Sequence, residues 1–275
     1  MNELLKQLTE ADGVSSAEKE IRTLIRDLIA DHVDEWHVDV MGNLIATRRG
    51  TGEVDLRVLV DAHMDEVGLM ISEIDSSGML KFEAIGGIDD RTLLGKVVRV
   101  GSKKHIGVIG ARPIHLLEGN QRNSIVKRNS MRIDIGAKDK QSASQKVKVG
   151  DIAAFVTPYE ELGNAAVGKA FDDRAGCALL VELLRGERFP FDLIASFTVQ
   201  EEVGLRGAQA AGYSIKPDAA FVLECTPAFD LPNKHDVSPN VALGKGPAIY
   251  VMDRVTIQDP RLVSHIAQTA DQHAI

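Results

Sequence analysis

The sequence has few cysteines and no long apolar run. Its 275 residues include two cysteines, Cys177 and Cys225, which are too few for a disulfide framework. No stretch approaches the roughly 18 consecutive apolar residues that a membrane span needs. The polar start MNELLKQLTEADG has no apolar signal core. We therefore expect a cytoplasmic protein that has no membrane partner.

Positive charge and aromatic side chains are also scarce. The chain has 32 Lys and Arg against 40 Asp and Glu, a net charge of −8, which argues against nucleic acid as a partner. Residues 122–148 are locally basic but include no aromatic residue to stack on a base. Their Gln141–Gln145 core is typical of a solvated loop. We expect no nucleic-acid site there.

The order of patterns along the chain predicts an α/β fold with an insertion. Hydrophobic residues make up 44% of the chain, enough for one large core or two smaller ones. Helical and strand patterns alternate in residues 1–71 and 159–275, which predicts a discontinuous α/β domain built on a helix-covered mixed sheet. Residues 72–158 contain short Val/Ile-rich runs separated by glycines, which predicts an inserted small β-barrel domain.

Individual elements follow from local spacing. A capping-box pattern, Ser15–Glu18, precedes apolar residues at helical spacing, and a hairpin pattern spans residues 36–47. The other expected helices are residues 3–9, 175–184, 207–211 and 260–274, and the other expected strands are 56–60, 192–199 and 219–223.

Acidic residues follow three of the predicted strands. Ligands bind at the carboxyl ends of strands in α/β sheets, so these residues are expected to share one crevice. The adjacent Asp172 and Asp173 stand where a loop enters the helix at residues 175–184. The residues after the strands are His63, Asp65 and Glu66, then Glu201 and Glu202, then Glu224.

This group of residues predicts a metal site. Taken singly, Asp172 is typical of a helix N-cap, Glu201-Glu202 of a solvated turn, and His63 of a structural histidine. Taken together, so many carboxylates in one crevice raise each other's pKa unless cations are present. Two divalent ions would remove that cost, and a histidine among carboxylates suits zinc, cobalt or manganese.

A pair of metals predicts hydrolysis. Two ions roughly 3.5 to 4 Å apart share a water, lower its pKa and polarise a carbonyl. Adjacent side chains at a strand end diverge, so Glu201 and Glu202 cannot both bind one metal. One of the two is therefore expected to bind metal, and the other to move a proton between the water and the leaving amine.

Motifs extend along nearly the whole chain. They are residues 60–68, 84–88, 112–115, 149–151, 170–176, 198–204 and 243–247. These motifs are similar to those of the tetrahedral (glutamyl or deblocking) aminopeptidase family, some members of which carry the label endoglucanase. The resemblance implies a catalytic α/β domain that removes amino-terminal residues from short peptides, and an inserted domain used for assembly, with dimers that often build hollow twelve-subunit tetrahedra.

The same resemblance implies how the site residues divide the work. It implies two divalent metal ions, with Asp172 bridging them, and a cis peptide bond after Asp172. One metal would be held by His63, Asp172 and Glu224, and the other by Asp172 and Glu202, while Glu201 acts as general base and Asp65 orients His63.

Two features depart from the family pattern. Glu224 stands where the family usually has Asp. The second metal's remaining ligand in the family is a His from a segment that would follow Ile275, so we expect the last part of the catalytic domain to be missing. A chain that ends at Ile275 is expected to bind at most one metal well and to have little activity. His265 and His273 lie in the predicted 260–274 helix, and we expect them to have surface or packing roles.

Two other functions stay open at the level of sequence. A glycosidase would use two carboxylates, but it would leave His63 and Asp172 unused, and aromatic residues make up only 4% of the chain. An inactive family member could act only in assembly. The side-chain preference of the substrate pocket and the identity of the metal are not predicted.

Overall fold

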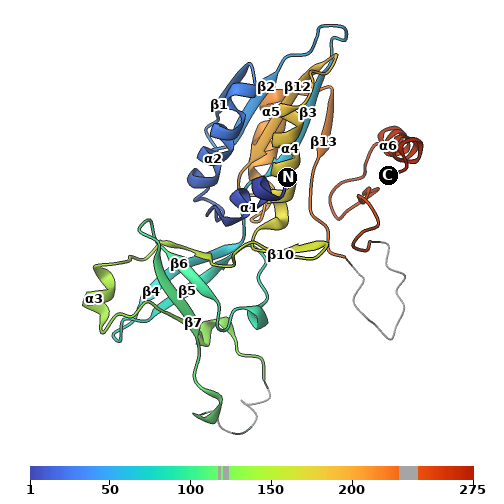
Figure 1. Ribbon diagram of the computed structural model, residues 1–275. Coiled ribbons are helices and arrows are strands. Elements are labelled where there is room, and N and C mark those ends of the chain that lie inside the picture. Colours follow the sequence, from blue (N-terminus) through green and yellow to red (C-terminus); the bar gives the residue numbers. More distant parts are fainter. Residues whose placement is uncertain (117–118, 120–123, 229–240) are drawn as a thin grey trace. The chain divides into compact units, whose positions relative to one another are not determined.

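The computed structural model describes residues 1–116, 119, 124–228 and 241–275. The chain divides into a unit of residues 1–224 and a unit of residues 225–275, and each is described by itself. The first unit contains a sheet with its helices and a closed barrel (Figure 1). Within the described part of the chain, every helix is too short or too polar to cross a bilayer.

The main sheet has five strands in the order β1-β2-β12-β3-β13. β12 and β13 run parallel to β3 on either side of it, whereas β1, β2 and β12 pair antiparallel. The expected mixed sheet and the expected hairpin, β1 with β2, are therefore confirmed. The strands are β1 (Glu35–Val38), β2 (Leu44–Arg48), β3 (Arg57–His63), β12 (Asp192–Thr198) and β13 (Ala219–Val222).

Helices cover both faces of the main sheet. Alternate residues of a strand point to opposite faces, and apolar residues on both faces of this sheet pack against helices. Leu44 and Ala46 of β2 join a core with the apolar faces of α1, α2 and α4. Ile45, between them, packs instead in a smaller cluster with Ala211 and Ile215 of α5. These helices are α1 (Asn2–Glu10), α2 (Lys19–Ile29), α4 (Phe171–Arg185) and α5 (Arg206–Ile215), and a short 3-10 turn, η1 (Ala30–His32), follows α2.

The insertion is a closed six-stranded barrel in the order β4-β5-β8-β7-β6-β9, as the sequence predicts. Its interior is apolar, with fully buried side chains such as Leu69, Leu80 and Val98. The strands are β4 (Gly68–Ile74), β5 (Leu80–Ile85), β6 (Val97–Val100), β7 (His105–Gly110), β8 (Arg132–Asp134) and β9 (Ile152–Phe155). Short 3-10 turns are η2 (Asp90–Thr92), η3 (Ile114–Leu116) and η5 (Arg128–Ser130).

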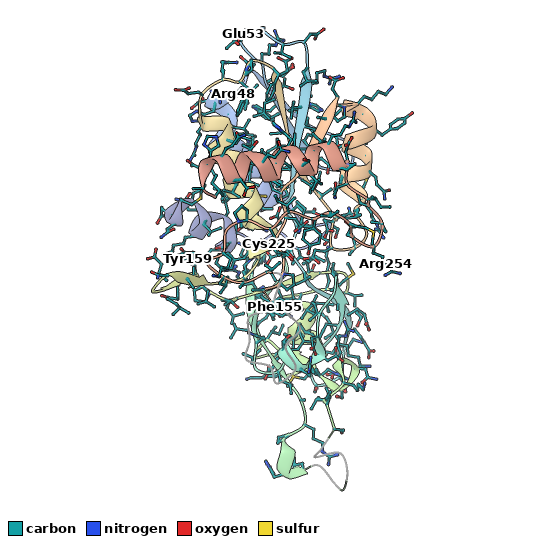
Figure 2. All side chains as sticks on the ribbon, turned by 90° about the vertical axis from the view of Figure 1, so that its right-hand side faces the viewer. Arg48, Glu53, Phe155, Tyr159, Cys225 and Arg254 are labelled. Atoms are coloured by element: carbon teal, nitrogen blue, oxygen red, sulfur yellow. The ribbon has the colours of Figure 1, made fainter. Side chains whose placement is uncertain are left out.

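The chain returns from the barrel to α4 through a two-stranded ribbon, β10 (Glu160–Leu162) with β11 (Ala165–Val167). Figure 2 shows Arg48 and Glu53 at the end of the main sheet that is far from the barrel, and Phe155 at the end of the barrel nearest the sheet. The carboxyl ends of β3, β12 and β13 lie at the opposite end of the sheet from Glu53. The predicted ligand residues therefore gather on the side where the chain enters the barrel.

Two local expectations are wrong. The Ser15–Glu18 pattern is not a capping box, because the Ser15 hydroxyl donates to Asp65 Oδ2 at 2.6 Å and α2 has no side-chain cap at Glu18. The expected loop at Gln141–Gln145 is largely a short helix, α3 (Lys140–Ser144), because Asp139 and Ser142 form a reciprocal capping box. Residues 122 and 123 of the basic stretch lie outside the described residues.

The second unit contains α6 (Pro260–His273), which begins at the N-cap Asp259, whose side chain accepts a hydrogen bond from the Arg261 N–H. Within this unit, Met252 pairs with Ile257 in an isolated bridge. His265 and His273 of α6 are both exposed.

Candidate metal centre

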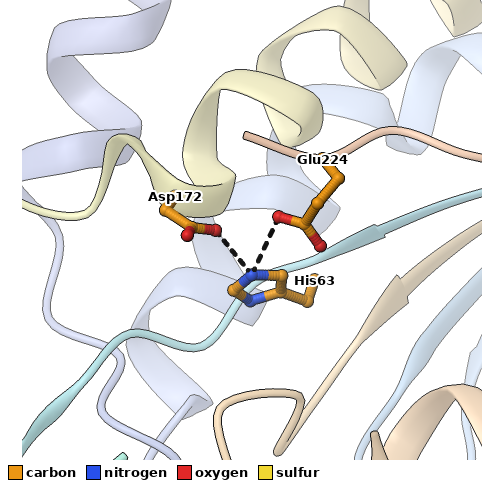
Figure 3. Close-up of side chains that lie close together, drawn as sticks. All are labelled: His63, Asp172 and Glu224. Carbon is orange, nitrogen blue, oxygen red and sulfur yellow. Dashed lines mark hydrogen bonds and ion pairs between the residues drawn. The ribbon is translucent and has the colours of Figure 1, made fainter. Parts of the chain in front are cut away.

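His63, the last residue of β3, is the centre of the predicted group. Its side chain is 3% exposed. Its Nε2 atom lies 2.9 Å from Asp172 Oδ1 and 3.6 Å from Glu224 Oε1 (Figure 3). The same atom lies 3.9 Å from Glu201 Oε2. Three separate elements thus bring carboxylates to the Nε2 edge of the imidazole ring. They are the start of α4, the segment after β13 and the loop after β12.

The other ring nitrogen of His63 faces Asp65. Nδ1 lies 3.1 Å from the Asp65 carbonyl oxygen and 3.4 Å from its Oδ1 atom. If Nδ1 carries the proton, Nε2 presents its lone pair toward Asp172 and Glu224, which is the tautomer that a metal-binding histidine needs.

Asp65 also holds the loop that carries the two glutamates. Its carboxylate is completely buried and accepts hydrogen bonds from the backbone N–H of Glu201 at 2.9 Å and of Glu202 at 3.3 Å. Burial opposes the charged form of Asp65, but hydrogen bonds from His63, Ser15 and Glu201 outweigh it, so its pKa is lowered.

Asp172 and Asp173 interrupt the regular geometry at the start of α4. Both have non-helical backbone angles, and the peptide bond between them is cis, as the resemblance implies. The Asp173 carboxylate accepts the Gly176 N–H at 3.0 Å, so Asp173 provides the local cap. Asp172 is therefore left to face His63, and its side chain is 57% exposed.

Glu202 lies beside Asp172 in a cavity of about 600 Å³ that also includes Lys169 and barrel residues such as Ile88 and Lys96. Gly86 in the barrel has φ +84°, and a Cβ atom there would lie 2.7 Å from Val67 and 3.3 Å from the Cβ of Glu202. Only glycine fits this approach. The barrel therefore helps to position Glu202.

Three carboxylates of this centre have no Lys or Arg side chain as an ion-pair partner in the described part of the chain. They belong to Asp172, Glu201 and Glu202. Burial, with added repulsion from Asp172 and Glu201, raises the pKa of Glu202 to about 7, and burial likewise raises the pKa of Glu201. For His63, burial opposes the charged form, but the neighbouring carboxylates prevail and raise its pKa.

These residues fit divalent cations. One ligand atom from each of His63, Asp172 and Glu224 lies within 4.8 Å of the others. Imidazole nitrogen with carboxylate oxygens is a donor set that zinc-like ions accept, and a cation would relieve the crowding of negative charge. A mixed α/β sheet with such a group at the carboxyl ends of its strands defines a candidate metal-dependent hydrolase.

Several residues that support the centre were missed by sequence reasoning. Asn43 is fully buried, accepts the Val199 N–H at 3.0 Å and donates to the Gly207 carbonyl at 2.9 Å, so it holds the chain on both sides of the Glu201-Glu202 loop. Lys169 donates to Glu66 Oε1 at 2.6 Å, within a buried network. No local pattern marks these partners, because each pair is distant in sequence.

Comparison with known proteins assigns the family. Residues 42–275 match the M42 glutamyl aminopeptidase family. A putative aminopeptidase from Acetivibrio thermocellus is 39% identical over 100% of this chain and 80% of its own length. The chain therefore belongs to the M42 glutamyl aminopeptidase family, whose members are metal-dependent aminopeptidases.

Solved structures agree with this assignment. The TET aminopeptidase from the marine sediment archaeon Thaumarchaeota archaeon SCGC AB-539-E09 has a TM-score of 0.94 and 37% identity, covering 99% of this chain and 78% of that one. A structure of the Pyrococcus horikoshii TET1 peptidase, which can assemble into a tetrahedron or a large octahedral shell, has a TM-score of 0.85 and 36% identity over 99% of this chain and 82% of that one. Family membership favours an aminopeptidase over the two-carboxylate glycosidase.

Proposed function

We propose that this protein removes amino-terminal residues from short peptides with the help of two divalent metal ions, zinc or cobalt, with manganese as a further candidate. The observation that carries the proposal is the convergence of three carboxylates, from Asp172, Glu201 and Glu224, on the Nε2 atom of His63 within 3.9 Å. Family membership supports the reaction class.

In this proposal His63, Asp172 and Glu224 hold one ion, and Asp172 with Glu202 holds the other. The 57% exposure of the Asp172 side chain supports a bridging role, because its carboxylate is accessible to ligands from solvent. Bound ions would supply Lewis acidity, which would lower the pKa of a water and polarise the peptide carbonyl. The longer side chain at Glu224, compared with the Asp usual in the family, still reaches 3.6 Å from His63 Nε2.

Glu201 is the proposed general base. Its carboxylate lies on the same edge of the imidazole ring as Asp172, with Oε2 at 3.9 Å from Nε2. Its backbone N–H donates a hydrogen bond to Asp65. Glu201 would accept the proton from the attacking water and return it to the leaving amine as the peptide bond breaks. Asp65 would keep His63 in its ligand tautomer.

The division into a catalytic domain, residues 1–71 and 159–275, and an assembly barrel, residues 72–158, is part of the same proposal. The assembly of the Pyrococcus horikoshii TET1 relative into a tetrahedron or a large octahedral shell supports a homo-oligomer. We propose that dimers of this chain form a dodecamer. The cytoplasmic location stays a prediction from the sequence.

Replacing Glu201 tests the mechanism. Glu201→Gln keeps the size of the side chain but cannot take a proton, so kcat should fall by about 10²–10⁴-fold while metal content is unchanged. Glu83→Gln, an exposed glutamate on the barrel strand β5, is the control and should keep full activity. Metal content is measured by elemental analysis, and activity with a panel of amino-terminal peptide substrates. Unchanged turnover of Glu201→Gln would remove Glu201 from this role.

A further inference from the structure

An amino-terminal segment runs directly against the loop that follows His63. Val14 forms a parallel bridge with Glu66. The Gly13 N–H donates to Glu66 Oε1 at 2.9 Å, the Glu66 N–H donates to the Gly13 carbonyl at 3.0 Å, and the Ser15 N–H donates to the Glu66 carbonyl at 3.2 Å. We call residues 13–15 the amino-terminal strap.

One side chain of the amino-terminal strap, Ser15, forms a hydrogen bond to the Asp65 carboxylate. Ser15 is 1% exposed, and its Oγ donates to Asp65 Oδ2 at 2.6 Å. The same carboxylate accepts the N–H groups of Glu201 and Glu202 and lies 3.4 Å from His63 Nδ1. Ser15 is therefore the one partner of this carboxylate that comes from outside the ligand-bearing loops, among the partners that the described structure gives it.

We propose that Ser15 is a positioning residue of the metal centre, acting through Asp65. Rotation of the Asp65 carboxylate about its Cβ–Cγ bond would disturb His63 and the backbone of Glu201 and Glu202 together. Among the described residues, Oδ1 accepts the Glu201 N–H at 2.9 Å, whereas Oδ2 has, besides Ser15, only the longer bond from the Glu202 N–H at 3.3 Å. The 2.6 Å bond from the buried Ser15 hydroxyl is therefore the shortest hydrogen bond that restrains Oδ2. The inference rests on the proposed function for its catalytic consequence, but the coupling itself is a property of the protein without metal.

The hydroxyl can be removed without releasing the strap. The backbone of the strap is held by its own hydrogen bonds to Glu66, which do not involve the Ser15 side chain. Gly13 also packs so closely on the Arg174 side chain that a Cβ atom would lie 2.5 Å from Nη2. Ser15→Ala should therefore change the environment of Asp65 and leave the path of the chain as it is.

Hydrogen exchange of the metal-free protein tests the coupling without any assay of activity. In Ser15→Ala, the amides of Glu201 and Glu202, followed by mass spectrometry in a peptide spanning residues 199–204, should exchange about tenfold faster. The control is Ser16→Ala, which removes an exposed hydroxyl from the neighbouring residue and should leave exchange unchanged. Unchanged exchange in Ser15→Ala would overturn the proposal.

A double-mutant cycle tests whether the effect passes through Asp65. With Co²⁺ as probe, Ser15→Ala should raise the dissociation constant about 10- to 100-fold and lower kcat more than it changes KM. In an Asp65→Asn background the same substitution should cost almost nothing further. Equal costs in both backgrounds would overturn the proposal. If the wild type neither binds Co²⁺ nor cleaves peptides while the exchange effect is present, the proposed function fails and the coupling stands.

Discussion

Replacing Arg174 should destabilise the protein strongly, because this side chain is fully buried and ties α4 to two other segments. Its Nε atom donates to the Met64 carbonyl at 2.9 Å, and its Nη1 atom donates to the Leu8 carbonyl and, at 3.1 Å, to the Ala11 carbonyl. Its Nη2 atom lies 3.7 Å from Glu66 Oε1. Arg174→Met fills similar space but leaves three carbonyls without this donor.

The magnitude follows from two opposing contributions. Each hydrogen bond from a charged donor contributes about 1.5–3 kcal/mol, so the loss of three bonds lowers the free energy of unfolding by at most about 9 kcal/mol. Methionine carries no charge, so the variant avoids the cost of burying a guanidinium, and this reduces the loss of stability by several kcal/mol. The Glu66 carboxylate keeps Lys169 as an ion-pair partner at 2.6 Å. The expected net loss is about 3–5 kcal/mol, or roughly 6–20 °C in Tm for a chain of this size.

Thermal unfolding followed by circular dichroism, with chelator present in every sample, measures this loss without a contribution from metal binding. The matched control is Arg185→Met on the same helix, because the Arg185 side chain is 31% exposed and pairs with Glu182. The control should lose less than about 1 kcal/mol. A Tm for Arg174→Met that equals that of Arg185→Met would refute the reasoning that the buried guanidinium holds α1 and the β3 exit against α4.

Two further predictions concern the centre itself. Exhaustive chelation should abolish peptide hydrolysis and lower Tm, and added Co²⁺ or Zn²⁺ should restore both. Tm falls because ions that bind only the folded state stabilise it by about 2.7 kcal/mol when the free-ion concentration is a hundred times Kd. Hydrolysis that survives chelation would contradict a metal-dependent reaction. Gly86→Ala should lower kcat by about tenfold or more by displacing Glu202, whereas Gly87→Ala, where a Cβ atom would meet nothing within 4 Å, should be neutral. Equal activity of the two glycine variants would show that the close approach has no consequence.

The residues gathered at the candidate centre are predictable from sequence because they obey a local rule. His63 ends β3, Glu201 and Glu202 follow β12, and Glu224 follows β13. Parallel strands bring their carboxyl ends to one edge, so acidic residues at those positions approach each other whatever the details of the loops. Which glutamate faces the imidazole more closely depends on side-chain geometry, and the sequence left that choice open.

The residues that support the centre follow no local rule. Ser15 in a Ser-x-x-Glu pattern is typical of a helix cap. Its hydroxyl instead donates to the Asp65 carboxylate, fifty residues away in sequence. A hydrogen bond to a charged carboxylate is stronger than the neutral bond that a cap would make with a backbone N–H. Asn43 reaches Val199 across an even longer separation. By contrast, the α3 cap formed by Asp139 and Ser142 is local, so an N-cap residue at Asp139 is a signal for this helix that the sequence itself contains.

The barrel contributes to the centre as well as to the proposed assembly. The chain passes from His63 at the end of β3 into the barrel strand β4, and it returns from the barrel through the β10–β11 ribbon to Asp172 at the start of α4. Barrel residues Ile88 and Lys96 line the same cavity as Asp172 and Glu202, and Gly86 meets Glu202 directly. Arg99 of β6 donates to the Glu10 carbonyl at 3.1 Å, which ties the barrel to α1. A shift of the barrel against the main sheet would therefore move Glu202 relative to His63, so contacts made by the barrel are coupled to the geometry of the metal centre.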